Sequence, residues 1–326
     1  MRIGVVVPCY RQEAFLPRTL AALERALEGR DWQGALVLSA APAAPLPVLS
    51  PRWRAVGPPA AGAAALTPGG ARMLGCAACD GDWVLFVDAD VEVERAWLDA
   101  AVEAAARAAE GPLAGLWGRL EEWFTGPAGE RPGRSDLYGV GGEERAVDYL
   151  ATLAFYRRAA LLAVGGYDAR LSSEEDFELG LRLRWGGREL RSLGTLAGRH
   201  WSAPRPSFAE LARRWRSGLC FGQGQVLRIY AGRRGFGVLL RRQRLYLAAL
   251  GLWGLGLAAL AAALLSGRPG PLALWAPAPL AVLALMSARK RSPRLAVHSL
   301  LTWTLQGVGL LAGLLRPLPR AGGAAC

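Results

Sequence analysis

The stretch Trp83-Val84-Leu85-Phe86-Val87-Asp88-Ala89-Asp90 decides the fold of this chain. Its first five residues are apolar and rich in β-branched and aromatic types, which predicts a short strand buried on both faces. In an open α/β sheet the ligand lies beyond the carboxyl ends of the strands, so Asp88 and Asp90 would lie at a binding site. Two carboxylates there suit a hard divalent cation that in turn holds a phosphate. The alternative is a plain strand-to-helix turn, in which Asp90 caps a helix that begins near Glu94.

Strand and helix patterns alternate around this stretch and predict a parallel, doubly wound sheet. Strands are expected over 3–7, 35–39, 52–56 and 113–120, and helices over 13–27, 67–79 and 95–109. Thr67 is expected to cap the second of these helices, with a proline in its first turn. The segment 125–145 is rich in Gly, Pro and charge, and predicts a mobile loop. Such a loop either closes over a ligand or is a surface insertion.

The second half of the chain is unusually apolar. The hydrophobic fraction of 52% and the positive mean hydropathy are too high for a purely soluble protein, and most of the excess follows residue 244. Three charge-free spans follow one another there, at 245–265, 271–288 and 295–315. The first and third have the roughly 20 residues that a transmembrane helix needs. The middle span carries Pro277 and Pro279, so it is expected to be kinked or re-entrant, and buried soluble helices are the alternative for all three.

Positive charge collects just before these spans. Between Leu181 and Tyr246, 15 arginines stand against two glutamates, so this segment carries the whole basic excess of the chain. It would lie against anionic lipids of the cytoplasmic leaflet, and the adjoining spans argue against a nucleic-acid partner. The basic residues that flank the spans place the N-terminal domain in the cytoplasm and the C-terminal end outside a cell membrane crossed several times. The N-terminal apolar run is only a strand long, so no signal peptide is expected.

Four motifs in a fixed order carry a resemblance to a known family. They are residues 5–10 (Val-Val-Val-Pro-Cys-Tyr), 70–75 (Gly-Ala-Arg-Met-Leu-Gly), 81–90 (ending in Asp88-Ala89-Asp90), and the run 165–168 (Gly-Gly-Tyr-Asp) with Glu174-Glu175-Asp176-Phe177-Glu178-Leu179 after it. Together they are similar to family 2 glycosyltransferases of the GT-A fold, over roughly 200 residues. The resemblance covers most of the part before the spans and says little about the spans themselves.

The resemblance implies a nucleotide-sugar donor, a UDP- or GDP-sugar, held through Mg²⁺ or Mn²⁺. Asp88 would lie near the ribose or the metal, and Asp90 on the metal. The loop from Pro8 through Tyr10 to Arg11 would approach the nucleotide. Arg72 would stand near the phosphates or brace the loop. The cation would neutralise the charge that builds up on the departing diphosphate.

The acidic run implies the acceptor half of the site. A general base must take the proton from the acceptor hydroxyl as it attacks, and by resemblance that base is Asp176, with Glu175 beside it and inversion as the outcome. Three acidic residues at a helix start would also simply favour the helix dipole. His200 is a candidate third metal ligand, because several GT-A enzymes place a late histidine on the metal, and a structural histidine is the alternative.

Two positions depart from the family pattern. The second strand usually ends in an aspartate that reads the base, and here Val37-Leu38-Ser39-Ala40-Ala41 stands there. The asparagine usual after Ala-Arg is Met73. The sequence therefore predicts a GT-A domain over 1–205, a basic interfacial amphipathic segment over 206–244, three transmembrane helices over 245–316 and a tail over 317–326. The expected function is transfer of a sugar to a lipid or isoprenoid acceptor, with a polyprenyl-phosphate sugar transferase or a non-catalytic membrane subunit as alternatives.

Overall fold

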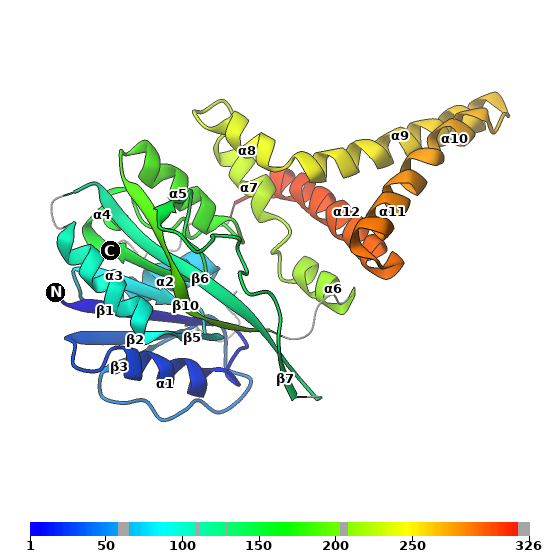
Figure 1. Cartoon of the computed structure of the whole chain (residues 1–326). Helices are drawn as coiled ribbons and strands as arrows, with labels where there is room; N and C mark the ends of the chain where they lie inside the picture. The colour runs from blue at the N-terminus through cyan, green and yellow to red at the C-terminus, as the bar shows by residue number, and fades with distance from the viewer. Residues whose placement is uncertain (58–64, 109–110, 128, 203–207, 319–326) are drawn as a thin grey trace. The chain divides into compact units, whose positions relative to one another are not determined.

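A computed structural model describes residues 1–57, 65–108, 111–127, 129–202 and 208–318 of the chain. These residues form two compact units, one within Met1–Pro204 and one within Arg205–Leu318. Figure 1 shows a twisted sheet with helices on both faces in the first unit and helices alone in the second.

One ten-stranded sheet organises the described residues of the first unit, in the order β3-β2-β1-β4-β9-β6-β10-β5, with β7 added to β6 and β8 to β10. The strands are β1 (Ile3–Cys9), β2 (Trp32–Leu38), β3 (Trp53–Val56), β4 (Trp83–Val87), β5 (Val91–Val93), β6 (Leu113–Gly126), β7 (Gly129–Pro132), β8 (Arg145–Ala146), β9 (Leu153–Arg157) and β10 (Glu189–Ser202). The helices are α1 (Leu16–Ala26), α2 (Pro68–Ala78), α3 (Arg95–Arg107), α4 (Arg158–Ala163) and α5 (Glu175–Trp185). The four strands and three helices named from the sequence are therefore confirmed as elements, with shifted ends.

The sheet is mixed, which corrects the expectation of a parallel one. β1 runs parallel to β2 and β4, and β6 runs parallel to β10, but β9 is antiparallel to both β4 and β6. β5 is antiparallel to β10. A strand that is buried on both faces gives the same continuous apolar run in either direction, so the sequence pattern cannot fix its direction.

The core lies in two layers, one on each face of the sheet. Along β4, Leu85 and Val87 belong to the layer under α1 and α3, while Val84 and Phe86 belong to the layer under α2, α4 and α5. Successive side chains of a strand point to opposite faces, so one short run supplies both layers. All five residues of β4 are buried, which explains why this stretch has no polar position.

The alternative in which Asp90 caps a helix is wrong. α3 begins at Arg95 with Glu94 at its N-cap position, and β5 lies between Asp90 and that helix. β5 pairs with β10, and Val91 stands opposite His200. Three residues are too few to show a strand period in the sequence, so this strand was not predicted.

The segment 125–145 is also only in part the predicted loop. β6 continues to Gly126 and folds back through β7, with Thr125 opposite Glu130. Arg18 of α1 forms an ion pair with Glu130 at 2.6 Å. Gly and Pro in this segment therefore mark a hairpin turn and the end of a strand. Composition alone does not distinguish such a hairpin from a loop.

The second unit is helical. Its elements are α6 (Phe208–Arg216), α7 (Gly222–Ile229), α8 (Phe236–Arg242), α9 (Arg244–Ser266), α10 (Gly270–Trp275), α11 (Pro277–Lys290) and α12 (Pro293–Leu315). Among the described residues, three helical segments are long and apolar enough to cross a membrane: Arg244–Ser266, Gly270–Lys290 and Pro293–Leu315. The middle one is broken at Pro277, between α10 and α11, as its prolines predicted.

Small residues let α7 approach α12 closely. A Cβ atom on Gly224 of α7 would lie 2.0 Å from the carbonyl oxygen of Leu310, and one on Gly313 of α12 would lie 2.1 Å from the carbonyl oxygen of Phe221. Glycine at such contacts is a common way to bring helices together in membranes. On α9, by contrast, the leucine side chains remain exposed: the exposed fractions of Leu255 and Leu257 are 68% and 69%.

Candidate functional site

The guanidinium of Arg72 is the centre of the candidate site. It lies on α2, whose first turn is capped by Thr67 through a hydrogen bond from the backbone N–H of Gly70 (3.0 Å), as the sequence predicted. Arg72 donates to Asp88 Oδ1 at 2.9 Å and to Glu175 Oε1 at 2.6 Å. Its side chain is only 6% exposed. One buried cation therefore joins the aspartate after β4 to the acidic start of α5.

Further groups surround the same guanidinium. Asp176 Oδ1 lies 3.7 Å from Arg72 Nη1, and the ring of Tyr167 lies under the guanidinium with its centre 5.2 Å away. Burial opposes the charge of Arg72, but the neighbouring Asp176 and Asp88 raise the pKa of the guanidinium well above its usual range. Arg72 thus stays charged and joins Asp88 to Glu175; its expected role, near the phosphates or against the loop from Pro8 to Arg11, stays a prediction.

Asp176 and Glu175 differ in their surroundings although they are neighbours. Glu175 is bound to Arg72 and its side chain is 8% exposed. Asp176 is about 20% exposed, and its Oδ1 has no hydrogen-bond partner among the described residues. Burial raises the pKa of Asp176 well above its usual range, and Arg72 offsets part of the rise. A carboxylate with a raised pKa and an oxygen that accepts no hydrogen bond is suited to accept a proton.

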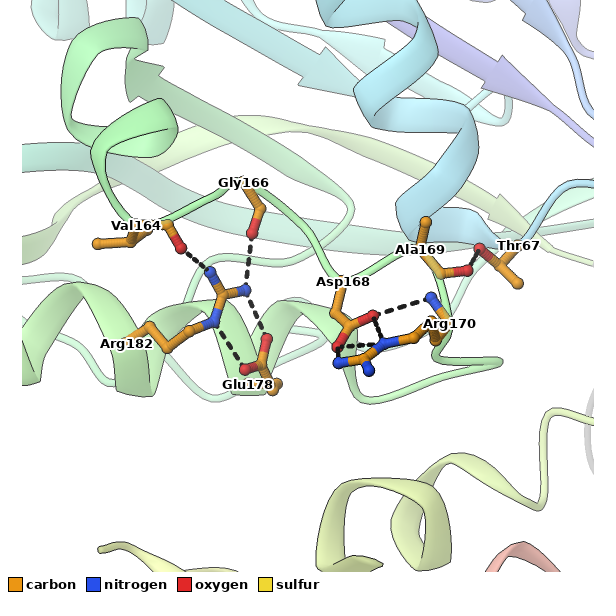
Figure 2. Close-up of polar contacts among 8 residues, drawn as sticks. All are labelled: Thr67, Val164, Gly166, Asp168, Ala169, Arg170, Glu178 and Arg182. Carbon is orange, nitrogen blue, oxygen red and sulfur yellow. Dashed lines mark hydrogen bonds and ion pairs between the residues drawn. The ribbon is translucent and has the colours of Figure 1, made fainter. Parts of the chain in front are cut away.

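Arg182 holds the loop that leads to α5. From the third turn of this helix it donates to the carbonyl oxygens of Val164 and Gly166, and it forms a two-pronged pair with Glu178, with contacts of 2.7 and 2.6 Å (Figure 2). Glu178 is nearly fully buried. A bidentate arginine pair has a fixed geometry, so it fixes the position of the loop relative to the helix.

A second set of contacts ties the same loop to α2. Arg170 donates to Asp168 through Nε and Nη2, and these bonds lower the pKa of Asp168 against the effect of its burial. The hydroxyl of Thr67 donates to the carbonyl oxygen of Ala169 at 2.7 Å (Figure 2). Thr67 therefore caps α2 and anchors the loop at once, which joins the two helices that carry Arg72 and Asp176.

Asp90 forms a separate cluster with His200. Asp90 Oδ2 accepts a hydrogen bond from Gln12 Nε2 at 2.5 Å and lies 3.5 Å from His200 Nε2. Asp90 Oδ1 is buried and has no hydrogen-bond partner among the described residues. Burial raises the pKa of Asp90 to about 6, while the neighbouring His200 lowers it. His200 Nδ1 lies 3.0 Å from the hydroxyl of Ser202, which orients the ring.

This cluster fits part of a divalent metal site. A carboxylate oxygen without a hydrogen-bond partner suits Mn²⁺ or Mg²⁺, while the neighbouring imidazole nitrogen is a donor that softer divalent metals prefer. In the described part of the chain, no three His, Cys, Asp or Glu side chains come close enough to hold a metal by themselves. Asp88, the third predicted ligand, is bound to Arg72 instead. The remaining ligands would therefore have to come from the donor or from water.

The residues predicted to approach the nucleotide follow β1. Pro8 is still part of that strand, opposite Val37 of β2. Tyr10 and Arg11 lie beyond it and are exposed, with the guanidinium of Arg11 5.5 Å from the centre of the Tyr10 ring. Arg11 has a positive φ of 56°. Gln12, which the sequence reasoning missed, connects this loop to Asp90, and its place one residue after the predicted loop was the only available signal.

Comparison with known proteins finds a similarity to one family over part of the first unit. A sequence-family model described as Glycosyl transferase family 2 matches residues 64–165. No curated protein matches the chain in sequence. Among solved structures, the chain is similar to residues 1–349 of S. aureus TarS in complex with UDP-GlcNAc, with 18% identity and a TM-score of 0.48, over 64% of this chain and 60% of that one.

Two further TarS structures from S. aureus are similar at the same level. The same fragment in complex with UDP has 17% identity and a TM-score of 0.48, over 67% of this chain and 65% of that one. TarS itself has 15% identity and a TM-score of 0.46, over 67% and 39%. The chain thus spans 60% of the length of the first of these structures. Sequence identities and TM-scores this low do not establish what this chain binds.

The matched family segment contains Arg72, Asp88 and Asp90. These are the residues that connect the end of β4 to α2 and, through β5, to β10. The part of the first unit over residues 64–165 is therefore similar in sequence to family 2 glycosyltransferases.

Proposed function

We propose that this chain is an inverting, metal-dependent glycosyltransferase that moves a sugar from a nucleotide-sugar donor to a lipid or isoprenoid acceptor at a membrane. The observation that carries the proposal is the position of Arg72. It binds Asp88, the first residue after β4, and Glu175, at the start of α5, although the two are distant in sequence. The residues expected to handle the donor and those expected to handle the acceptor thus converge on one cation.

Donor binding is assigned to the edge of the sheet where β1 and β4 end. Asp90 and His200 would hold the divalent cation, which would neutralise charge on the departing diphosphate. Gln12 positions Asp90 Oδ2 and leaves Oδ1 without a partner, as a ligand oxygen requires. Asp88 would face the ribose or the metal, and Tyr10 and Arg11 would approach the nucleotide. The donor is a UDP- or GDP-sugar.

Proton removal from the acceptor is assigned to Asp176. Its Oδ1 has no hydrogen-bond partner and lies 3.7 Å from Arg72 Nη1, and its pKa is raised, which suits a general base, whereas Glu175 is bound to Arg72 by a 2.6 Å hydrogen bond. A base on the acceptor side, opposite the leaving diphosphate, gives inversion in a single displacement. Glu175 then has a positioning role, because it holds Arg72 next to Asp176.

Membrane attachment supports the acceptor class. The second unit has three apolar helical segments of membrane-spanning length, and α6 carries three arginines in its last turn. Four further basic residues, Arg289, Lys290, Arg291 and Arg294, stand around the link between α11 and α12. By the charge rule this link and the first unit would share the cytoplasmic side. A site held at the membrane surface meets lipid hydroxyls or phosphates by diffusion in two dimensions.

Calorimetric titration of the solubilised full-length chain tests the proposal. UDP, GDP and their sugars are titrated with and without Mn²⁺, and one nucleotide is expected to bind in a metal-dependent way. Asp90→Ala should abolish that binding, because it removes both oxygens next to His200, and Asp31→Ala is the matched control, with an exposed carboxylate at the surface. If no nucleotide binds the wild-type chain, the chain is a non-catalytic subunit and the proposal is refuted.

A further inference from the structure

A row of four aromatic side chains lies beside the candidate site and has no assigned role in donor binding or proton transfer. The ring centre of Trp117 is 5.2 Å from that of Tyr138 and 5.9 Å from that of Tyr149, and Tyr149 is 5.6 Å from Phe177. Phe177 follows the proposed base Asp176 on α5. We propose that Tyr138, the exposed member of this row, is a subsite that stacks against a pyranose ring of the acceptor, with the buried rings supporting it, so that the acceptor is already glycosylated. This inference rests on the proposed function and deepens it.

Tyr138 lies between the two halves of the site. Its hydroxyl forms a 2.5 Å hydrogen bond with the hydroxyl of Thr152, and the carbonyl oxygen of Thr152 accepts from the backbone N–H of Asp88 at 2.9 Å. Burial raises the pKa of Tyr138, and the negative charges of Asp88 and Asp176 raise it further. The phenol group is therefore within electrostatic range of both carboxylates.

Part of Tyr138 nevertheless remains open to solvent. The residue is 37% exposed, while its hydroxyl is bound to Thr152 and Trp117 lies beside its ring. Trp117 itself is buried, and its indole N–H has no hydrogen-bond partner among the described residues. An aromatic residue with an anchored polar end and a bare apolar surface is a typical contact surface for an amphipathic ligand.

The loop that presents Tyr138 is held in place from several sides. Asp136 accepts hydrogen bonds from the backbone N–H groups of Val140 (3.1 Å) and Gly141 (2.8 Å), and Leu137 donates to the carbonyl oxygen of Leu120 (2.8 Å). Thr152 has a positive φ of 64°, which is rare for a β-branched residue. Such a conformation persists only where surrounding contacts hold it, and it is concentrated at binding sites. The surface is thus preorganised.

A sugar ring fits this surface better than a base or an alkyl chain. A pyranose presents C–H groups on one face, which pack on an aromatic ring, and hydroxyls at its edge, which carboxylates accept. An alkyl chain could donate no hydrogen bond to Asp88 or Asp176 and would displace water from them. The nucleotide base is expected beside β1 and β2, whereas the aromatic row belongs to β6 and its neighbours, on the other side of β4 in the sheet order.

Saturation-transfer NMR on the full-length chain in nanodiscs tests the inference. The probes are the methyl β-glycopyranosides of glucose, galactose, mannose and N-acetylglucosamine at millimolar concentration. At least one is expected to receive saturation on its ring C–H protons. Tyr138→Ala should raise its dissociation constant about tenfold, because the stacking surface is lost. Tyr138→Phe keeps the ring and should stay within about threefold. Phe124→Ala removes a partly buried ring of β6, the strand that carries Trp117, and is the matched control.

Two further arms separate the possible outcomes. In the Asp176→Asn background, the nucleotide sugar that binds in calorimetry is added, and the glycoside signal should persist. Loss of the signal would place the glycoside in the donor site and overturn the inference, as would equal saturation in wild type and Tyr138→Ala. Donor binding without saturation of any glycoside would refute the inference alone, whereas absence of donor binding refutes the proposed function.

Discussion

Replacing Arg72 by methionine should destabilise the first unit strongly. The side chain is 6% exposed and forms ion pairs with Asp88 at 2.9 Å and Glu175 at 2.6 Å. Removal of one partner from a buried ion pair costs about 3–5 kcal/mol, because the carboxylates that remain are buried without compensation. At about 2–4 °C per kcal/mol for a domain of this size, the melting temperature of the unit should fall by roughly 6–20 °C.

Differential scanning fluorimetry of the solubilised chain measures this change. Arg107→Met is the control, because Arg107 pairs with Glu103 on the surface of α3 and is 66% exposed, so it should cost less than about 0.5 kcal/mol. In the double variant Arg72→Met with Glu175→Gln, the buried carboxylate loses its charge together with its partner. Glu175→Gln should therefore restore about 1–3 kcal/mol of the stability that Arg72→Met removes.

Two results would refute the reasoning about Arg72. One is a fall in melting temperature no larger than that of Arg107→Met. The other is strict additivity of Arg72→Met and Glu175→Gln, which would mean that the two side chains do not interact in solution. Either would leave the convergence of donor and acceptor residues without its central contact.

Three further changes test other parts of the site and fold. Asp176→Asn should lower transfer by roughly 10²–10⁴-fold and leave donor titration unchanged, since only the base is lost. Because burial raises the pKa of Asp176, the folded state favours its protonated form, so stability from this group is present below the ordinary carboxyl pKa and is lost as pH rises through the folded pKa. The melting temperature of Asp176→Asn, relative to that of the wild type, should therefore rise with pH. A difference in melting temperature that does not change with pH would contradict the burial of Asp176. His200→Ala should weaken Mn²⁺-dependent nucleotide binding in calorimetry, and unchanged Mn²⁺ dependence would exclude His200 as a ligand. Gly224→Ala should destabilise the second unit by about 1–3 kcal/mol, because its Cβ would lie 2.0 Å from a carbonyl oxygen of α12; Gly251→Ala on α9, which has no atom within 4 Å of the added Cβ, is the control, and equal melting temperatures would refute the close contact.

Local pattern predicted the elements of this fold but not their directions. The runs 3–7 and 83–87 are strands because each supplies two buried faces, and Thr67 caps α2 because its side chain satisfies an N–H in the first turn. The antiparallel course of β9 depends on contacts with β4 and β6 that no local period encodes. The same holds for β5, whose pairing with β10 brings His200 to Asp90.

The sequence allowed several residues of the site to be named, but it did not predict the contacts among them. Resemblance named Arg72, Asp88, Glu175 and Asp176, yet nothing in the sequence indicates that the Arg72 guanidinium lies within ion-pair distance of all three carboxylates. Tyr138 and Thr152 were missed entirely, since a positive φ at a threonine and a hydrogen bond between loop residues leave no pattern in composition or spacing. Long-range polar contacts depend on the finished fold, so they become visible only in three dimensions.

The link between α11 and α12 has a consequence for biosynthesis. α11 ends at Lys290 and α12 begins at Pro293, and Arg291 between them turns the chain with a φ of 52° while Ser292 caps α12. So short a connection makes the two helices an antiparallel hairpin. They would have to enter a bilayer together, as one loop whose basic turn never crosses it. In a membrane, a chain truncated within α12 would therefore lose the anchorage of α11 as well, and α9 would be the one candidate span left intact among the described residues.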